Sequence, residues 1–375
     1  MAVTIKHVVS KDELKDFVYF GIKLYEGNDY FVPPLVYDEL ATLNPRKNPA
    51  FEHCDAACFL AYRHGEIVGR IAVIINHRAN RIWKQRQARF GFVDFIDDNE
   101  VVDALFNTAE EWARFRGMEK IHGPLGFSDM DHEGMLIKGF DRIGTLSTIY
   151  NYPYYVDHMN RMGYVKDQDW FEYLIKIPDR IPERYIRASE IVKKRFGLQM
   201  IHPKDKKETM TYANDIFGLI NRGYRDLYGY VELTQKQIDY YADMYLPMLR
   251  LEFLSLVIRQ EDNKLVGVGI GLPSLAKALQ KAKGRFLPTG WIELYRALKG
   301  KNEVLDLLLV AVDPEYQGKG INAMMFNQFI LGANRLGMKY AESNLELEDN
   351  NKVQSMWKNM DAEQHKQRRA FIKEL

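Results

Sequence analysis

The sequence predicts an α/β protein made of two domains with similar architecture. The chain has 375 residues, and domains of about 100–200 residues are usual, so two domains are expected. One order of elements (strand, helices, hairpin, strand, helix, strand, helix, strand) occurs twice. Between the two series, residues 177–182 place two prolines around charged residues, which predicts a linker. We therefore predict domains at 1–178 and 179–375, each with a mixed, mostly antiparallel central sheet flanked by helices.

Apolar spacing, alternation and turn residues define the elements of the first half. The turn at Gly65 suits a hairpin, whereas Gly117 and Gly163 end helices. Expected strands cover residues 5–9, 58–63, 67–76, 89–95, 120–123 and 170–177, and expected helices cover 12–25, 99–117 and 153–162.

The second half repeats this order and adds a helical excursion at 275–300, which is broken near Pro288. Residues 261–263 turn a hairpin, and Gly337 ends a helix. Expected strands cover residues 198–202, 253–260, 264–272, 303–312, 339–346 and 363–374, and expected helices cover 207–227, 234–249, 320–336 and 350–360.

The charge balance argues against nucleic acid or a membrane as partner. The chain has 52 Lys and Arg against 51 Asp and Glu, a formal net charge of +1, so no global field attracts polyanions. The longest apolar runs, such as 307–312, have the length of a strand, whereas a membrane helix needs about 20 apolar residues. The first residues also lack a signal pattern. These features predict a cytoplasmic protein, either monomer or homodimer.

The cysteine content predicts neither a disulfide scaffold nor a metal site. Cys54 and Cys58 are the two cysteines of the sequence, and a structural zinc site needs four ligands. We expect two ordinary, half-buried thiols. Residues 122 and 131–133, two histidines and two carboxylates beside a Gly/Pro turn, are a weaker metal candidate.

The most informative segment is residues 307–321, LLLVAVDPEYQGKGI. An apolar strand runs into a proline turn, then a loop bracketed by Gly318 and Gly320, then a helix. The first N–H groups of a helix lack internal partners and the helix dipole adds partial positive charge, so this helix start suits a pyrophosphate. The glycines remove Cβ atoms from the path of the phosphates, and Lys319 adds charge at the rim.

Two other phosphate-binding loops fit less well. A Walker loop would need a glycine five residues before Gly318 and Ser or Thr after Lys319, where this chain has Gly320. The run GVGIG at 267–271 hints at a dinucleotide fingerprint, but it lies in a hairpin strand and no clear helix opens after it. We expect close backbone packing at that strand instead.

The pattern from Val310 through residue 322 resembles the acetyl-CoA signature of the GCN5-related N-acetyltransferase (GNAT) superfamily, V-x-P followed by R/Q-x-x-G-x-G/A. Here Asn322 replaces the final Gly or Ala, and the specific match is confined to 317–321. The resemblance implies that acetyl-CoA is a co-substrate. The residues that it assigns to the coenzyme are Val310, Val312, Gln317, Gly318, Lys319, Gly320, Ile321 and Asn322.

The next motif of the superfamily, N-x-x-A-x-x-x-Y on a helix, is altered in this chain. The resemblance implies that Asn350 touches the pantetheine arm of the coenzyme. Trp357 stands where the family tyrosine often protonates the leaving thiolate. An indole cannot donate a proton as a phenol can, so the usual general acid is missing from its usual place.

The first half resembles the same fold but lacks the Q-x-x-G-x-G loop. The acidic run at 97–100 would repel a pyrophosphate. We interpret this half as a degenerate copy that shapes a substrate pocket. The whole chain thus resembles the tandem-GNAT proteins of bacteria.

Amine acetylation needs a base, and three residues are candidates for the catalytic groups. Alternation along 339–346 puts Glu346 on one face with two other polar side chains, Glu342 and Asn344. Neighbouring carboxylates raise one another's pKa, although a solvated edge is an equally open interpretation. Asp306 is an acid inside an apolar strand. Tyr228 lies between two early helices, a region that lines the acceptor site in the superfamily, and a packing role is also open for it.

The leading hypothesis is transfer of an acetyl or other acyl group from acetyl-CoA to an amine of a small molecule or peptide. Backbone N–H groups near Val310 and Val312 would polarise the thioester carbonyl. One alternative is a non-catalytic protein that binds or senses acyl-CoA, which the departures at Asn322 and Trp357 favour. Another is a Fem-like aminoacyl transferase, although the sequence has no basic arm for tRNA.

Overall fold

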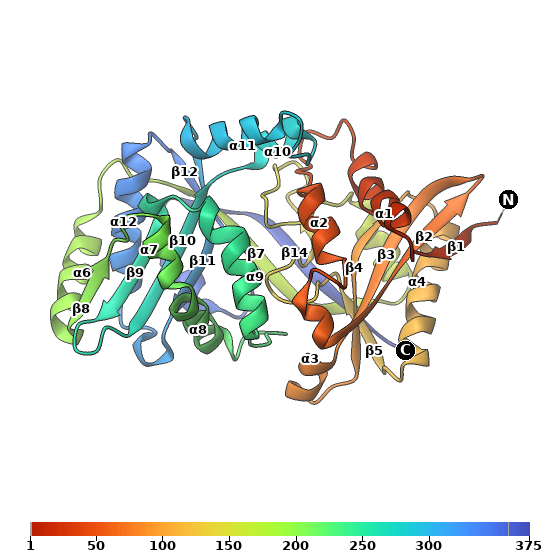
Figure 1. The fold of residues 1–375 in the computed structure, drawn as a ribbon, viewed down its shortest axis with the longest axis horizontal. Coiled ribbons are helices and arrows are strands. Elements are labelled where there is room, and N and C mark those ends of the chain that lie inside the picture. The colour runs from red at the N-terminus through yellow and green to blue at the C-terminus, as the bar shows by residue number, and fades with distance from the viewer. Residues whose placement is uncertain (1, 359) are drawn as a thin grey trace. The chain divides into compact units, whose positions relative to one another are not determined.

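The computed structural model describes residues 2–358 and 360–375, and they form two compact units (Figure 1). Unit 1 contains the N-terminal residues through Phe171 together with Ala276–Glu293 and His365–Leu375. Unit 2 contains Glu172–Leu275 and Leu294–Gln364. Both are sheets with flanking helices, which confirms the predicted α/β class. Among residues 2–358 and 360–375, no helix is both long and apolar enough to cross a membrane.

Unit 1 is built on a mostly antiparallel sheet in the strand order β1-β2-β3-β4-β5-β14. Only β4 and β5 pair in parallel among the first five strands. The strands are β1 (Thr4–His7), β2 (Cys54–Arg63), β3 (Glu66–Asn76), β4 (Gln87–Phe95), β5 (Lys120–Gly123) and β14 (Ala362–Glu374), and β6 (Met135–Lys138) also pairs with β14.

Three helices of unit 1 match the predicted helices 12–25, 99–117 and 153–162, whereas the helices Val36–Thr42 and His77–Ile82 were not predicted. Ser10 and Glu13 form a capping box at the start of α1. Asp98 caps α4, which packs its buried face on the sheet, and Gly117 with φ of 75° follows the end of α4. The helices are α1 (Lys11–Lys23), α2 (Val36–Thr42), α3 (His77–Ile82), α4 (Asn99–Phe115), α5 (Tyr154–Arg161) and α10 (Ala276–Ala282).

Unit 2 has a sheet in the order β8-β9-β10-β11-β12-β7, in which β11 and β12 are parallel. Its strands are β8 (Leu198–Ile201), β9 (Leu254–Arg259), β10 (Leu265–Pro273), β11 (Val304–Val312), β12 (Tyr340–Ser343) and the end of β7 (Val165–Lys176), and the short β13 (Glu346–Leu347) follows β12. Its helices are α6 (Glu183–Phe196), α7 (Lys206–Thr211), α8 (Ala213–Tyr224), α9 (Gln235–Tyr245), α12 (Asn322–Arg335) and α13 (Asn351–Trp357), and α11 (Gly290–Lys299) begins in unit 1 and ends in unit 2.

Three predicted elements of the second half differ from the structure, and one helix was not predicted. The sequence analysis did not identify α6, and the expected helix 207–227 is divided into α7 and α8 at Tyr212. The expected strand 339–346 stops at Ser343 and resumes as β13. The expected helix 350–360 ends at Trp357, and residue 359 of that range lies outside the described residues.

Each unit takes a strand from beyond the predicted boundary at residue 178. In unit 1, Phe371 of the C-terminal β14 pairs with Gly123 of β5. In unit 2, Leu174 of β7 pairs with Glu342 of β12. The predicted domains 1–178 and 179–375 therefore have other boundaries than the two compact units. The division of the chain into these two domains stays a prediction.

We expect the Phe371→Ala variant to weaken unit 1, although residue 371 is near the C-terminus. Its ring is buried in the same core as Phe90 and Ile121, and such truncations cost about 3–5 kcal/mol of unfolding free energy. Urea denaturation of the full chain measures the loss, and peptide-resolved hydrogen exchange should show it in β4 and β5. Phe115→Ala, at a side chain 87% exposed, is the control. Loss of protection confined to unit 2 would contradict this assignment.

Candidate active site

The candidate site starts where β11 and β12 of unit 2 diverge. The two strands pair in parallel only from Val304–Tyr340 to Leu307–Ser343. Asn344 then closes the ladder, because its backbone N–H donates to the Leu307 carbonyl at 3.1 Å and its side chain to the Leu308 carbonyl at 2.9 Å. Beyond this point β11 continues to Val312 along β10 alone.

The peptide groups of Val310 and Val312 face the side that β12 has left. The Asp313 N–H donates to the Val266 carbonyl of unit 2 at 2.9 Å, and peptide groups in an antiparallel strand alternate in direction. Two side chains bind the carbonyls on this side. The Tyr224 hydroxyl donates to the Val310 carbonyl at 2.9 Å, and the Gln317 amide to the Val312 carbonyl at 3.3 Å. The N–H groups of Val310 and Val312 point into the same gap.

The glycines of the loop after β11 are required by backbone conformation. Gly318 and Gly320 have φ of 73° and 86°, a region that L-residues with a side chain rarely adopt. A Cβ at Gly318 would meet nothing within 4 Å, so space is not the constraint there. The turn leads residues 317–320 over the surface and into α12, a helix of 14 residues. Its first N–H groups are thus presented beside the gap.

Asp313 holds the end of β11 against the loop. It is buried, and its carboxylate lies 3.1 Å from Lys264 Nζ and 3.3 Å from Arg222 Nε. It also accepts a hydrogen bond from the Glu315 N–H. Burial acts to raise the pKa of Asp313, but the hydrogen bonds from Lys264 and Glu315 and the positive charges outweigh it and lower that pKa. The anchor therefore stays ionised at neutral pH.

Lys319 supplies positive charge at the rim of the loop. Its Nζ lies 5.2 Å from the centre of the Phe196 ring and 5.4 Å from that of Tyr316. Cation–π contact holds the ammonium group near the loop without neutralising it. The position suits a phosphate oxygen.

Asn322 and Asn350, two residues assigned to the coenzyme, both contact α13. The Asn322 side-chain nitrogen lies 2.7 Å from the Met356 sulfur, so this amide is directed towards α13. Asn350 caps α13 by accepting a hydrogen bond from the Val353 N–H at 3.3 Å. Only the amide nitrogen of Asn350 is left for the contact with pantetheine that the resemblance implies.

Glu346 is a buried acid with an elevated pKa. Glu346 is only 8% exposed. Its Oε1 accepts a hydrogen bond from the Trp357 indole N–H at 2.7 Å. Among the described residues Oε2 has no hydrogen-bond partner. Burial raises the pKa of Glu346 to about 7, although the hydrogen bonds from Trp357 and Ser343 act to lower it. A carboxyl group with this pKa can take up and release protons near neutral pH.

The cause of this pKa differs from the one we expected. Ala341 lines the same apolar pocket as Trp357, so the next residue of β12, Glu342, points to the opposite face of the sheet. The break after Ser343 then brings Glu346 to the side of Trp357. The prediction that Glu342 and Glu346 share a face is wrong, and desolvation replaces carboxylate repulsion as the cause.

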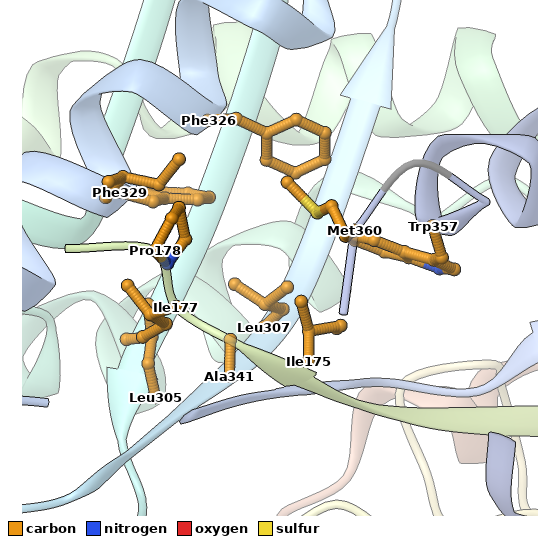
Figure 2. A pocket seen from close by; sticks show the side chains of 11 residues that line it. Ile175, Ile177, Pro178, Leu305, Leu307, Phe326, Phe329, Ala341, Trp357 and Met360 are labelled. Carbon is orange, nitrogen blue, oxygen red and sulfur yellow. The ribbon is translucent and has the colours of Figure 1, made fainter. Parts of the chain in front are cut away.

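The apolar pocket next to Trp357 lies between α12 and the sheet of unit 2 (Figure 2). Its enclosed volume is about 30 Å³, and the figure rises to about 370 Å³ only when the open solvent at its mouth is included. Figure 2 shows Trp357 beside Met360 at one end and Phe329 with Pro178 at the other. The lining has no polar side chain apart from the indole N–H that Glu346 binds: Ile175, Ile177, Pro178, Leu305, Leu307, Phe326, Phe329, Ile330, Ala341, Trp357 and Met360.

The other two predicted catalytic residues lie on other elements, Asp306 on β11 and Tyr228 after α8. Asp306 is buried on β11 between two residues that line the pocket, Leu305 and Leu307, so its side chain points to the opposite face, as Glu342 does. Tyr228 is half-buried in the turn after α8. Sequence reasoning singled out Tyr228, whereas Tyr224 is the tyrosine that contacts β11 at the gap. A pattern of several nearby tyrosines cannot distinguish them.

The metal candidate predicted from the sequence, residues 122 and 131–133, lies in unit 1. No set of three or more His, Cys, Asp or Glu residues suited to a metal ion is found in the part of the chain that the structure describes. Burial raises the pKa of both Cys54 and Cys58 to about 12. Both thiols are therefore protonated at neutral pH.

Known proteins resemble this chain over its whole length. No family model matches it. Protein YghO of Escherichia coli (strain K12) is 26% identical over 377 residues, covering 99% of this chain and 95% of that protein. A bacterial ceramide synthase of Caulobacter vibrioides (strain NA1000 / CB15N) is 28% identical over 377 residues, covering 97% and 95%.

Among solved structures, a tandem GNAT protein from the clavulanic acid biosynthesis pathway superposes with a TM-score of 0.57. The match covers 99% of this chain and 98% of that one, at 12% sequence identity. The chain has a GNAT fold. The fold predicted from residues 317–321 and from the order of elements is thereby confirmed.

In unit 1 the backbone closes the gap beyond the paired part of the parallel strands β4 and β5. After the pairing of β4 with β5, the Leu125 N–H donates to the Phe90 carbonyl at 2.8 Å. A Cβ at Gly91 would lie 2.3 Å from the Leu125 carbonyl oxygen, so only glycine permits this close approach. Asp98 occupies the start of α4 and pairs with Arg63. The backbone thus fills the place where unit 2 is open.

We expect Tyr224→Phe to lower the unfolding free energy of the chain by about 0.5–1.5 kcal/mol, because it removes the hydrogen bond to the Val310 carbonyl. Denaturant melts check the change, and hydrogen exchange should show it in α8 and β11. Tyr295→Phe, at an exposed tyrosine of α11, should be silent. An unchanged melt for Tyr224→Phe would show that the Tyr224 hydroxyl does not stabilise β11 at the gap.

Proposed function

We propose that unit 2 transfers an acyl group from an acyl-CoA thioester, with acetyl-CoA as the simplest donor, to the amine of a small molecule or peptide. The observation that carries this proposal is the gap between β11 and β12 beside the start of α12. Phosphates bind at such a helix start, where Gly318 and Gly320 allow the turn. Lys319 adds charge, and Gln317 fixes the Val312 carbonyl at the entrance to the gap.

The residues around the gap have separate roles in this reaction. The N–H groups of Val310 and Val312 bind the donor, and one of them stabilises the negative charge on the thioester carbonyl oxygen. The amine nitrogen attacks the carbonyl carbon, a C–N bond forms, the C–S bond breaks and the thiolate leaves. Glu346 takes the proton that the attacking nitrogen loses, and the thiolate takes a proton from solvent or from this acid. Asn350 orients the pantetheine arm.

A second candidate is N-acylation of a long-chain amine. One relative is a ceramide synthase by name, and a ceramide is the amide of a fatty acid with a long-chain amino alcohol. The apolar lining beside Trp357 offers a surface for contact with an apolar chain of the donor or acceptor, but its enclosed volume of about 30 Å³ does not hold a whole chain. The chemistry at Glu346 is the same for both candidates, because each forms an amide.

Two further alternatives are tested by the same experiments. A protein that only binds acyl-CoA would show binding without turnover, which suits the tryptophan in place of the family tyrosine. A Fem-like aminoacyl transferase would not bind acyl-CoA at the loop of residues 317–320.

The first experiment is calorimetric titration of acetyl-CoA into the purified chain and into a Gly318→Glu/Gly320→Glu variant. We expect the variant to bind at least about 100-fold more weakly, because two carboxylates repel the pyrophosphate. Gly65→Glu is a matched control, since Gly65 also has a left-handed φ, of 81°, and open space around it, but lies in a hairpin of unit 1. Absence of binding by the wild type would overturn the acyl-CoA proposal.

The pH dependence of turnover tests Glu346. A base must be deprotonated, and burial raises the pKa of Glu346 to about 7, so kcat/KM should rise with pH through about 7 and then level off. We expect Glu346→Gln to reduce kcat/KM by about 10²–10⁴-fold and to abolish this limb. Glu261→Gln, an exposed acid in the turn after β9, is the control. A limb that persists in Glu346→Gln would assign the base to another residue.

Trp357→Phe tests how the base is held. Loss of the indole N–H removes a hydrogen bond that favours the ionised carboxylate, so the pKa of Glu346 should rise and the rate limb should move to higher pH. If Trp357 had only a structural role, Trp357→Phe would lower the rate by the same factor at every pH.

A further inference from the structure

The excursion between β10 and β11 exposes large apolar side chains. Phe286 is 54% exposed and Leu287 is 69% exposed in the loop after α10. On α11, Trp291 and Tyr295 are 47% and 60% exposed, and their spacing of four residues puts them on one face of the helix. Clusters of this kind on a protein surface mark sites of interaction.

The same excursion is strongly basic. Residues 276–293 of unit 1 contain four Lys or Arg side chains and one acid, Glu293, in a chain whose net charge is +1. Lys281 lies 3.8 Å from Glu293, and Lys283 pairs with Glu26 at 3.0 Å. Lys277 and Arg285 are exposed, and among the described residues no carboxylate lies within ion-pair distance of either. The balanced total charge therefore conceals a local positive patch.

Contacts within unit 1 hold the loop of the excursion in place. The Gln280 side chain donates to the carbonyls of Asp29 and Phe31 at 2.8 and 3.0 Å. The Val36 N–H donates to the Gly284 carbonyl at 2.9 Å. Gly284 has φ of 68°, and a Cβ there would lie 2.3 Å from the Pro34 carbonyl oxygen. These contacts fix the chain immediately before residues 285–289.

We propose that residues 276–293 of unit 1, the basic aromatic segment, bind the surface of a bilayer that contains anionic lipids. Helical segments with Trp, Phe or Leu beside Lys and Arg lie in the interface between headgroups and acyl chains. Trp and Tyr favour that depth because their rings have an apolar body and a polar edge. Nucleic acid would use the charges and the aromatic rings but not the aliphatic side chain of Leu287. This inference revises the expectation, drawn from the balanced net charge, that no membrane partner exists.

The test is flotation of the full chain with vesicles of phosphatidylcholine alone or with about 30% phosphatidylglycerol. We expect binding to the anionic vesicles, with release as salt rises to about 0.5 M, because screening weakens attraction to the surface. Phe286→Ser/Leu287→Ser should weaken binding by at least about tenfold. Lys277→Gln/Lys281→Gln should weaken it less and reduce the salt dependence.

Two controls separate the surface from general effects on folding or charge. Phe115→Ser changes a side chain that is 87% exposed on α4, and Lys204→Gln/Lys207→Gln removes two exposed charges from unit 2. Both should bind vesicles as the wild type does. Acetyl-CoA titration of the Phe286→Ser/Leu287→Ser variant should match the wild type, so a failure of lipid binding is distinguishable from a failure of the proposed acyl transfer.

Wild-type chain that stays unbound with anionic vesicles at low salt would overturn the proposal. Equal binding by Phe286→Ser/Leu287→Ser and the wild type would also overturn it. A dimer in light scattering that Phe286→Ser/Leu287→Ser converts to monomer, together with no vesicle binding, would instead assign the surface to a second copy of the chain.

Discussion

The parallel pairing of β11 with β12 ends after four residue pairs, and the candidate site of unit 2 depends on that early end. A continued ladder would bind the peptide groups of Val310 and Val312 to a neighbouring strand. Asn344 ends the ladder by bonding Leu307 and Leu308 with its backbone and side chain. Asp313 keeps the free part of β11 in place through Lys264 and Arg222. Rigid strands thus present polar groups in a gap, as electrostatic catalysis requires.

The break in β12 also explains the state of Glu346. Because the strand stops at Ser343, Glu346 lies on the face of the apolar pocket and loses most of its contact with water. The indole of Trp357 then has two environments, with its ring against the pocket and its N–H on the carboxylate. A phenol at this position could donate its own proton, whereas the indole N–H only positions an acid nearby. The tryptophan that departs from the family motif is therefore the residue that holds the acid with the raised pKa.

Unit 1 has no open gap of this kind between its parallel strands. Its parallel strands β4 and β5 also stop pairing early, but the backbone at Leu125 moves against β4, where Gly91 leaves room for it. What unit 1 carries instead is the surface formed around residues 26–36 and the excursion that packs on them. A lipid-bound surface on this unit would be compatible with an apolar chain in the reaction of unit 2.

The sequence by itself determined the local features. Apolar spacing, alternation and glycines at turns and helix ends predict most strands and helices, because these signals act between residues close in the chain. The loop at 317–321 predicts the helix start for the same reason. The tertiary structure alone decided which strand completes each sheet, since β14 returns to unit 1 from the far end of the chain. It also chose Tyr224 over Tyr228 and separated Asp306 from Glu346, because burial and strand faces depend on contacts between distant residues.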